Sequence, residues 1–166
     1  MSVRGSGPFV RVAIALGSNL GDRRAHLDYA IDALRLDLTS MIVSSFQETE
    51  PVGVGPEHGP YLNAAVVGDT QLPARLLLER LLDIEEERGR ARPYPAAPRT
   101  LDADLILYGS EIINEYGLLV PHPRFHERDF VLAPLAEIAP EMIDPVTKKT
   151  IIDLWNRSSG DQEISF

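Results

Sequence analysis

Two strand–helix–strand patterns follow each other along the chain, and this order limits the possible folds more than any other feature of the sequence. Each pattern has an apolar, β-branched segment, then apolar residues at the three-and-four spacing of an amphipathic helix, then another apolar segment. The predicted strands are 10–16, 41–49, 61–69 and 101–108, and the predicted helices are 24–36 and 73–88. Such a chain buries its apolar faces by placing helices on a sheet. We therefore expect an α+β fold, a ferredoxin-like layered sandwich in which helices cover a mostly antiparallel sheet.

The ends of these segments carry turn and cap residues. Gly17-Ser18-Asn19 ends the first strand, Asp22 is a candidate N-cap for the first helix, and Pro73 opens the second. No repeat or low-complexity linker divides the chain. We expect a single domain over residues 1–166, with residues 1–9 as a flexible N-terminal extension.

The C-terminal third adds shorter elements. Ile112-Ile113 follows a turn and is expected to pair back on the preceding strand. Residues 130–138 are predicted to form a short helix that Pro140 ends, and residues 151–155 form a last amphipathic segment.

Composition excludes several classes of protein. The chain has no cysteine, which removes disulfides, thiolate zinc sites and a cysteine nucleophile, and which fits a cytoplasmic protein. Its net charge of −9 argues against general nucleic-acid binding, because an acidic surface repels phosphates. No apolar run reaches the roughly 18 residues of a membrane span, so no membrane association is expected. Nothing marks an interface, so we expect a monomer.

Asp102 and Asp104 form the sharpest local feature, at the start of the fourth predicted strand. Alternate side chains of a strand share a face, so the two carboxylates point the same way, with Cα atoms about 7 Å apart. A divalent cation relieves their repulsion, and Mg²⁺ prefers such carboxylates together with water and phosphate oxygens. The alternative is a solvated edge strand with two exposed aspartates.

Arginines cluster just before these aspartates, at Arg88, Arg90, Arg92 and Arg99. Cations beside a carboxylate pair are what a polyphosphate with Mg²⁺ requires. The alternative is ion pairing with the acidic run at 85–87, one turn earlier on the predicted helix.

Two further features have a weaker link to function. The segment 17–22 connects a strand to a helix and could bind phosphate, but a capped structural turn is the favoured interpretation. His122 and His126 are four apart, yet the prolines on both sides of His122 make a helix there improbable, so we do not predict zinc. His122, beside Arg124 and Arg128, is instead a candidate hydrogen-bond donor to phosphate, or simply a surface loop histidine.

Taken together, these segments resemble the 6-hydroxymethyl-7,8-dihydropterin pyrophosphokinase family of folate biosynthesis. The resemblance runs from about residue 12 to 155, and P-R-T-L-D-x-D followed by V-P-H-P-R is its most specific part. The matching segments are A-L-G-S-N-L-G-D at 15–22, S-S-F-Q-E-T-E-P-V-G at 44–53, Y-L-N-A-A-V at 61–66, I-E-E-E-R-G-R-A-R at 84–92, A-P-R-T-L-D-A-D-L-I-L-Y-G at 97–109, V-P-H-P-R at 120–124 and R-D-F-V-L-A-P-L at 128–135.

The resemblance implies that ATP, as co-substrate, transfers its pyrophosphoryl group to the hydroxymethyl oxygen of the pterin and leaves as AMP. It also implies two Mg²⁺ ions held by Asp102 and Asp104, with Arg90 and Arg99 as catalytic arginines that neutralise developing charge.

The same resemblance assigns the binding residues. Glu85, Arg92, His122 and Arg128 match positions that contact ATP. Asn63 matches the amide that reads the pterin ring edge, Tyr61 and Phe130 match the aromatic positions beside it, and the backbone of Thr49, Pro51, Val52 and Gly53 supplies further ring-edge contacts.

Some features depart from the family, and other functions stay open. Some members carry a tryptophan before P-R-T, whereas this chain has Tyr94 in a proline-rich segment, and some have an aromatic residue where Pro123 stands. The alternative enzyme is a nucleotidyltransferase, because Gly17-Ser18 and a later D-x-D are typical of that class. The non-enzymatic alternative is a pterin-binding module without catalysis.

Overall fold

A computed structural model describes residues 7–50, 59–89 and 100–164, with side chains as far as Ser158. The elements in chain order are β1 (Val10–Ser18), α1 (Arg23–Leu34), β2 (Thr39–Val43), β3 (Gln47–Thr49), β4 (Tyr61–Thr70), α2 (Ala74–Glu87), β5 (Asp102–Tyr108), β6 (Ile113–Glu115), β7 (Leu118–Val120), a 3-10 turn η1 (Phe125–Glu127), α3 (Asp129–Ile138) and α4 (Ile151–Ile164). Within this part of the chain no helix is both long and apolar enough to cross a bilayer.

The main sheet has the strand order β2-β4-β1-β5, with β3 also paired to β4. Every pair in it is antiparallel. With α1 between β1 and β2, and α2 between β4 and β5, the topology is the βαββαβ arrangement of ferredoxin-like folds. The predicted α+β layered sandwich is therefore confirmed.

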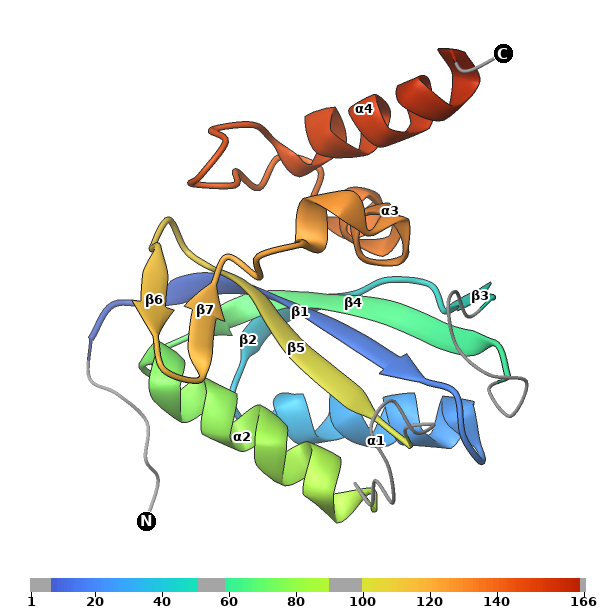
Figure 1. The fold of residues 1–166 in the computed structure, drawn as a ribbon. Helices are drawn as coiled ribbons and strands as arrows, with labels where there is room; N and C mark the ends of the chain where they lie inside the picture. The colour runs from blue at the N-terminus through green and yellow to red at the C-terminus, as the bar shows by residue number, and fades with distance from the viewer. Residues whose placement is uncertain (1–6, 51–58, 90–99, 165–166) are drawn as a thin grey trace.

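Helices cover both faces of this sheet (Figure 1). Helices α1 and α2 lie side by side on one face, α3 lies on the other, and α4 packs on the outer side of α3. The alternation of the strands divides the core accordingly. Ile14, Val66 and Leu105 belong to the cluster under α1 and α2, whereas Ala65 and Val67 belong to the cluster under α3 and α4.

The two helices on the first face begin where the sequence indicates. The carboxylate of Asp22 accepts a hydrogen bond from the backbone N–H of Ala25, which satisfies one of the free donors at the start of α1. Pro73 stands just before α2, where its missing N–H costs nothing. Both predicted helices are confirmed to within about two residues at each end.

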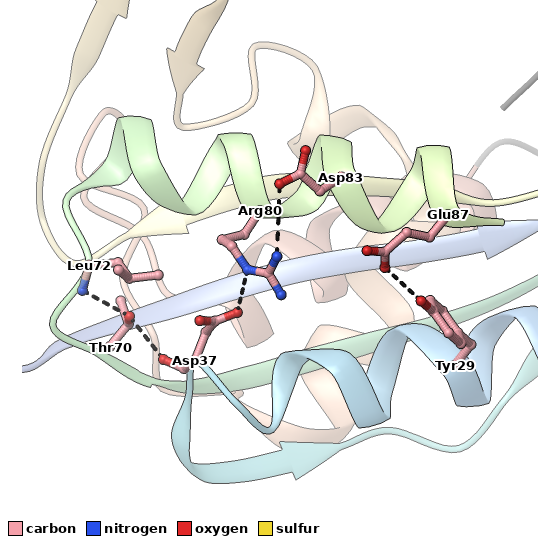
Figure 2. Close-up of polar contacts among 7 residues, drawn as sticks. All are labelled: Tyr29, Asp37, Thr70, Leu72, Arg80, Asp83 and Glu87. Atoms are coloured by element: carbon pink, nitrogen blue, oxygen red, sulfur yellow. Dashed lines mark hydrogen bonds and ion pairs between the residues drawn. The ribbon is translucent and has the colours of Figure 1, made fainter. Parts of the chain in front are cut away.

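Polar contacts fix α2 laterally against α1 and the turn that follows it (Figure 2). The Arg80 guanidinium donates to Asp37 at 3.0 Å, and the Tyr29 hydroxyl donates to Glu87 at 2.6 Å. The bond to Asp37 raises the pKa of Arg80, and the bond to Glu87 raises the pKa of Tyr29. These contacts join α2 to α1 and to the turn after α1.

The predicted strand 41–49 is wrong as a single element, because it breaks between β2 and β3. Val43 pairs with Val66 and Gln47 pairs with Asn63, so three residues stand opposite two on β4. Ser44 maintains the contact with Ala65, since its hydroxyl accepts from the Ala65 N–H at 2.8 Å. The extra residue is accommodated as a bulge-like irregularity, which the β-rich composition of the segment does not reveal.

Two other boundaries differ from the sequence expectation. Residues 112–113 do not pair back on β5; Ile113 pairs with Val120 in the separate β6–β7 hairpin, because the Gly117 turn at a φ of 74° reverses the chain there. The last helix runs to residue 164 instead of ending near residue 155. Residues 1–6 of the expected N-terminal extension lie outside the described residues, and Gln71 donates a hydrogen bond to the carbonyl of Gly7.

Candidate active site

Asp102 and Asp104 lie half-buried on the face of the sheet that α3 covers. Ala103, between them, is 5% exposed and packs in the core under α1 and α2, so its two neighbours point to the opposite face. Asp102 stands opposite Gly17 on β1, and Asp104 stands opposite Ala15. The two carboxylates share one face, as their spacing predicts.

A row of three residues crosses the sheet at this end. Gly17 is opposite Asp102 on one side and opposite Asn63 of β4 on the other. With strands about 4.8 Å apart, Asn63 and Asp102 are separated by about 10 Å, with no side chain between them. A Cβ at Gly17 would come within 3.2 Å of Asn63 Oδ1.

Gly17 lies in a strand between Asn63 and Asp102, a position that its sequence context does not reveal. It was expected in the turn after the strand, but β1 continues through Gly17 to Ser18, and the neighbouring Asn19 is buried. The available signal was a glycine at the end of an otherwise β-branched strand, which often marks the close approach of a ligand or of another backbone. This row is hereafter called the Asn63–Gly17–Asp102 row.

The amide of Asn63 is held in a fixed orientation. Asn63 is 5% exposed, and its Nδ2 donates to the Thr49 hydroxyl at 2.6 Å. Thr49 of β3 in turn stands opposite Tyr61 of β4. Three of the residues expected to bind pterin (Thr49, Tyr61 and Asn63) are thus neighbours on β3 and β4, and we call them the pterin subsite.

The other expected pterin contacts come from elsewhere. Phe130 lies in the first turn of α3, is 43% exposed, and has the Arg128 guanidinium 5.8 Å from its ring centre. Helix α3 packs against β4 and β3. Pro51, Val52 and Gly53 lie outside the described residues.

His122 lies along the free edge of β5. Its backbone N–H donates to the carbonyl of Ile106 at 3.0 Å, which places the half-buried imidazole near the aspartate pair. Burial lowers the pKa of His122 most strongly, the Asp104 carboxylate opposes this by raising the pKa, and the Arg128 cation lowers it. His122 is therefore within electrostatic range of both Asp104 and Arg128.

His126 does not share this environment. It lies in the 3-10 turn η1, where its ring meets the edge of Phe125 and its Nε2 is 3.9 Å from Glu127. The two histidines, four residues apart, therefore lie in different places: His122 beside β5, and His126 on the surface in η1.

Glu85 is buried beneath the strand that carries the aspartates. It is 5% exposed, and its Oε2 accepts from the backbone N–H of Ala103 at 2.8 Å. Because β5 is an edge strand, this carboxylate satisfies an N–H that has no neighbouring strand to pair with. The structure thus shows Glu85 bonded to the protein backbone, and its expected contact with ATP stays a prediction.

The expected arginines Arg90, Arg92 and Arg99 lie outside the described residues. Gly89 and Thr100 flank this segment, and the Thr100 hydroxyl donates to the carbonyl of Gly89 at 3.2 Å. This bond joins the C-terminal end of α2 to the start of β5. Arg88, the fourth member of the cluster, contacts α1: its Nε donates to His26 Nδ1 at 3.0 Å, and its guanidinium lies over the Tyr29 ring.

The two aspartates suit Mg²⁺, which takes several of its ligands from water and phosphate, better than they suit a metal bound by protein side chains alone. Among the described residues no group of three or more His, Cys, Asp or Glu side chains could hold a metal ion. Two carboxylates on one face suit a cation that keeps its other positions for water and phosphate oxygens.

Known proteins are similar in sequence to this chain. The family model described as 7,8-dihydro-6-hydroxymethylpterin-pyrophosphokinase (HPPK) matches residues 13–140. The 2-amino-4-hydroxy-6-hydroxymethyldihydropteridine pyrophosphokinase of Bacillus subtilis is 42% identical over 156 residues, covering 90% of this chain and 93% of the relative. The protein of the same description from Haemophilus influenzae is 42% identical over 135 residues, covering 80% and 83%.

A solved structure shares the fold. Plasmodium falciparum HPPK-DHPS A437G with SDX-DHP aligns with a TM-score of 0.79 at 16% identity, covering 97% of this chain and 47% of the other. This chain therefore spans about half the length of that protein, and the match concerns the fold alone.

A ferredoxin-like sheet with an aspartate pair and an amide on one face places the chain in the α+β class. The family match and the identities are specific enough to go further. The chain belongs to the 7,8-dihydro-6-hydroxymethylpterin-pyrophosphokinase family.

Proposed function

We propose that this chain transfers pyrophosphate from ATP to the hydroxymethyl group of 6-hydroxymethyl-7,8-dihydropterin, the reaction of its family in folate biosynthesis. The observation that carries the proposal is the Asn63–Gly17–Asp102 row. It supplies an oriented amide for a flat ring and a carboxylate for metal-bound phosphates, with a glycine between them. The interval of about 10 Å leaves room for the reacting hydroxymethyl group and the transferred phosphates.

In this proposal the hydroxymethyl oxygen forms a bond to the β-phosphorus of ATP. The bond from that phosphorus to the bridging oxygen of the α-phosphate breaks, AMP leaves, and the hydroxyl proton is lost to solvent. The residues of the chain mainly hold the two substrates in line, which is how phosphoryl-transfer enzymes achieve most of their acceleration.

Asp102 and Asp104 are the proposed magnesium ligands, and two ions are expected. Bound Mg²⁺ neutralises charge on the phosphate oxygens during transfer. The half-buried position of both carboxylates supports this role, because a low-dielectric site strengthens their attraction for a cation.

The nucleotide is proposed to lie along the free edge of β5. His122 and Arg128 are the described residues in this role, and the electrostatic influence of both Asp104 and Arg128 on His122 supports it. Arg90, Arg92 and Arg99 are assigned here from the sequence, with Arg90 and Arg99 as the catalytic arginines.

The pterin is proposed to bind the pterin subsite, with its ring edge on Asn63 and its face beside Tyr61 and Phe130. The bond from Asn63 to Thr49 supports this, since it holds the amide in place with its Oδ1 toward Gly17. The backbone at 51–53 completes the contacts in this proposal.

The assay that tests the reaction measures AMP formed from ATP and Mg²⁺, with and without 6-hydroxymethyl-7,8-dihydropterin. The expected result is pterin-dependent AMP. Release of inorganic pyrophosphate instead would identify a nucleotidyltransferase. Tight pterin binding without AMP would identify a binding module and overturn the proposed reaction.

A monomeric state and a cytoplasmic location are further parts of the proposal. The first rests on the absence of an interface signal in the sequence, and the second on the cysteine-free composition. Sedimentation of the purified chain and fractionation of its host cells test them.

A further inference from the structure

Helix α1 begins with two arginines, where the helix dipole favours acidic residues. Its first turn contains no acidic residue, although the positive end of the dipole lies there. Arg23 and Arg24 therefore do not serve the stability of α1 itself. Their contacts lie elsewhere: the Arg24 guanidinium stands 4.7 Å from the ring centre of Phe46, just before β3, and Arg23 reaches β3 and the residue before β4.

Arg23 joins two segments that are separate in the sequence. Its Nη1 donates to the Glu48 carboxylate of β3 at 2.8 Å and to the backbone carbonyl of Pro60 at 2.9 Å. A terminal guanidinium nitrogen carries two hydrogens, so one nitrogen can make both bonds. Glu48 directly precedes Thr49, and Pro60 directly precedes Tyr61.

These contacts lie behind the pterin subsite. Thr49 and Tyr61 stand opposite each other in the β3–β4 pair, and Thr49 accepts from Asn63. Since successive side chains of a strand alternate, Glu48 points to the α1 face while Thr49 points to the face with the pterin subsite. Arg23 thus holds the subsite from the opposite side of the sheet and does not touch its contents.

The strand that Arg23 holds is very short. β3 comprises three residues, and its register with β4 consists of three pairs. Strands this short have little stability of their own, so the contacts of Arg23, of the Asn63 amide and of α3 together determine the position of β3.

We propose that Arg23 is a positioning residue for the pterin substrate. It locks β3 to the start of β4, and thereby sets the distance between Thr49 and Tyr61 and the orientation of the Asn63 amide. The inference rests on the proposed function of this site, and adds to it a residue that contacts neither substrate.

The simpler interpretation is a surface ion pair without consequence. The side chains of Arg23 and Glu48 are 30% and 54% exposed, and exposed pairs are usually weak. The second acceptor distinguishes the two interpretations. The Pro60 carbonyl is a backbone atom, so a charged donor on it fixes the main chain beside Tyr61 whatever the Glu48 side chain does.

The test compares Arg23→Ala and Arg23→Lys with Arg35→Ala. Arg35 stands at the other end of α1 and forms an exposed ion pair with Asp32 at 3.8 Å, so it controls for loss of a surface charge. Wild type is first shown to make pterin-dependent AMP. The dissociation constant of the pterin is then measured with Mg²⁺ and a saturating non-hydrolysable ATP analogue, and that of the analogue is measured alone.

Arg23→Ala is expected to weaken pterin binding by about 3- to 10-fold, the size of one or two lost hydrogen bonds, with the affinity for the analogue within about twofold. Arg23→Lys should recover part of the loss, because an ammonium group can still bond one acceptor. Arg35→Ala should bind pterin as wild type does.

Pterin affinity within twofold of wild type in Arg23→Ala would overturn the inference. So would an equal loss for pterin and nucleotide, since that would indicate general destabilisation. A wild-type chain without pterin-dependent AMP would instead contradict the proposed function, so the two failures are distinguishable.

Discussion

At the scale of single residues, Gly17 leaves the space between Asn63 and Asp102 free of a side chain. We predict that Gly17→Ala weakens pterin binding by roughly tenfold, because the new Cβ comes within 3.2 Å of Asn63 Oδ1 and displaces the amide. Titration of pterin by fluorescence measures this. The matched control is Gly7→Ala, where a Cβ meets nothing within 4 Å. Equal pterin affinity in the two variants would contradict the assignment of the row.

Asp102 and Asp104 have a different predicted signature. Asp102→Asn and Asp104→Asn should each lower kcat by at least about 10³-fold, since each removes a charged metal ligand but keeps the size of the side chain. The melting temperature should stay close to that of wild type, because both side chains are half-buried and point away from the core under α1 and α2. Turnover that persists in the Asp102→Ala, Asp104→Ala double variant would show that the metal assignment is wrong.

At the scale of elements, the contact between α2 and β5 is predicted to carry stability. Glu85→Ala leaves the N–H of Ala103 without its acceptor and should lower the free energy of unfolding by about 1–3 kcal/mol. Glu85→Gln keeps an amide oxygen at the same place and should lose less. Urea unfolding measures the free energy of unfolding of both variants. A larger loss in Glu85→Gln than in Glu85→Ala would contradict a backbone role for Glu85.

The contact between α1 and α2 is predicted to depend on pH through His26. Burial, with the Arg88 cation, lowers the pKa of His26 below 6.5, while Asp22 raises it in part. A lowered pKa in the folded state means that the unfolded chain binds more protons as the pH falls below 6.5, so stability is full above that pH and is lost beneath it. Protonation also ends the acceptor role of Nδ1 toward Arg88.

His26→Gln tests this dependence. Between about pH 8 and about pH 5.5, wild type should lose more unfolding free energy than the variant, and urea unfolding at the two pH values gives the comparison. His122, whose pKa is also lowered, contributes equally to both proteins. Parallel curves for wild type and variant would show that His26 does not carry the effect.

At the scale of the whole molecule, the site draws on four strands and the start of α3, so its ligands should stabilise the entire domain. An ATP analogue with Mg²⁺ and a pterin at 100 times their dissociation constants should each add about 2.7 kcal/mol to the free energy of unfolding. Thermal unfolding with each ligand and with both measures this. Asp102→Asn should lose the increment from the nucleotide and keep that from the pterin.

How much of this molecule could be predicted differs between its parts. Helices α1 and α2 followed from the periodicity of their apolar residues and from Asp22 and Pro73, because these signals are local. The break between β2 and β3 did not, since it depends on how Ser44 meets Ala65, 21 residues away. The pairing of Ile113 with Val120 depends on the turn at Gly117, a local signal that the apolar pattern of the segment does not include.

The sequence by itself determined the α+β class, the order of the elements, the shared face of Asp102 and Asp104 and the resemblance to the family, because each depends on local spacing or on short motifs. Only the tertiary structure decided that Gly17 separates Asn63 from Asp102, that Glu85 bonds the backbone between the aspartates, and that Arg23 reaches behind the pterin subsite. These relations join residues that are 18 to 85 positions apart. They arise from the register of antiparallel strands and the seating of helices on them, which no local pattern encodes.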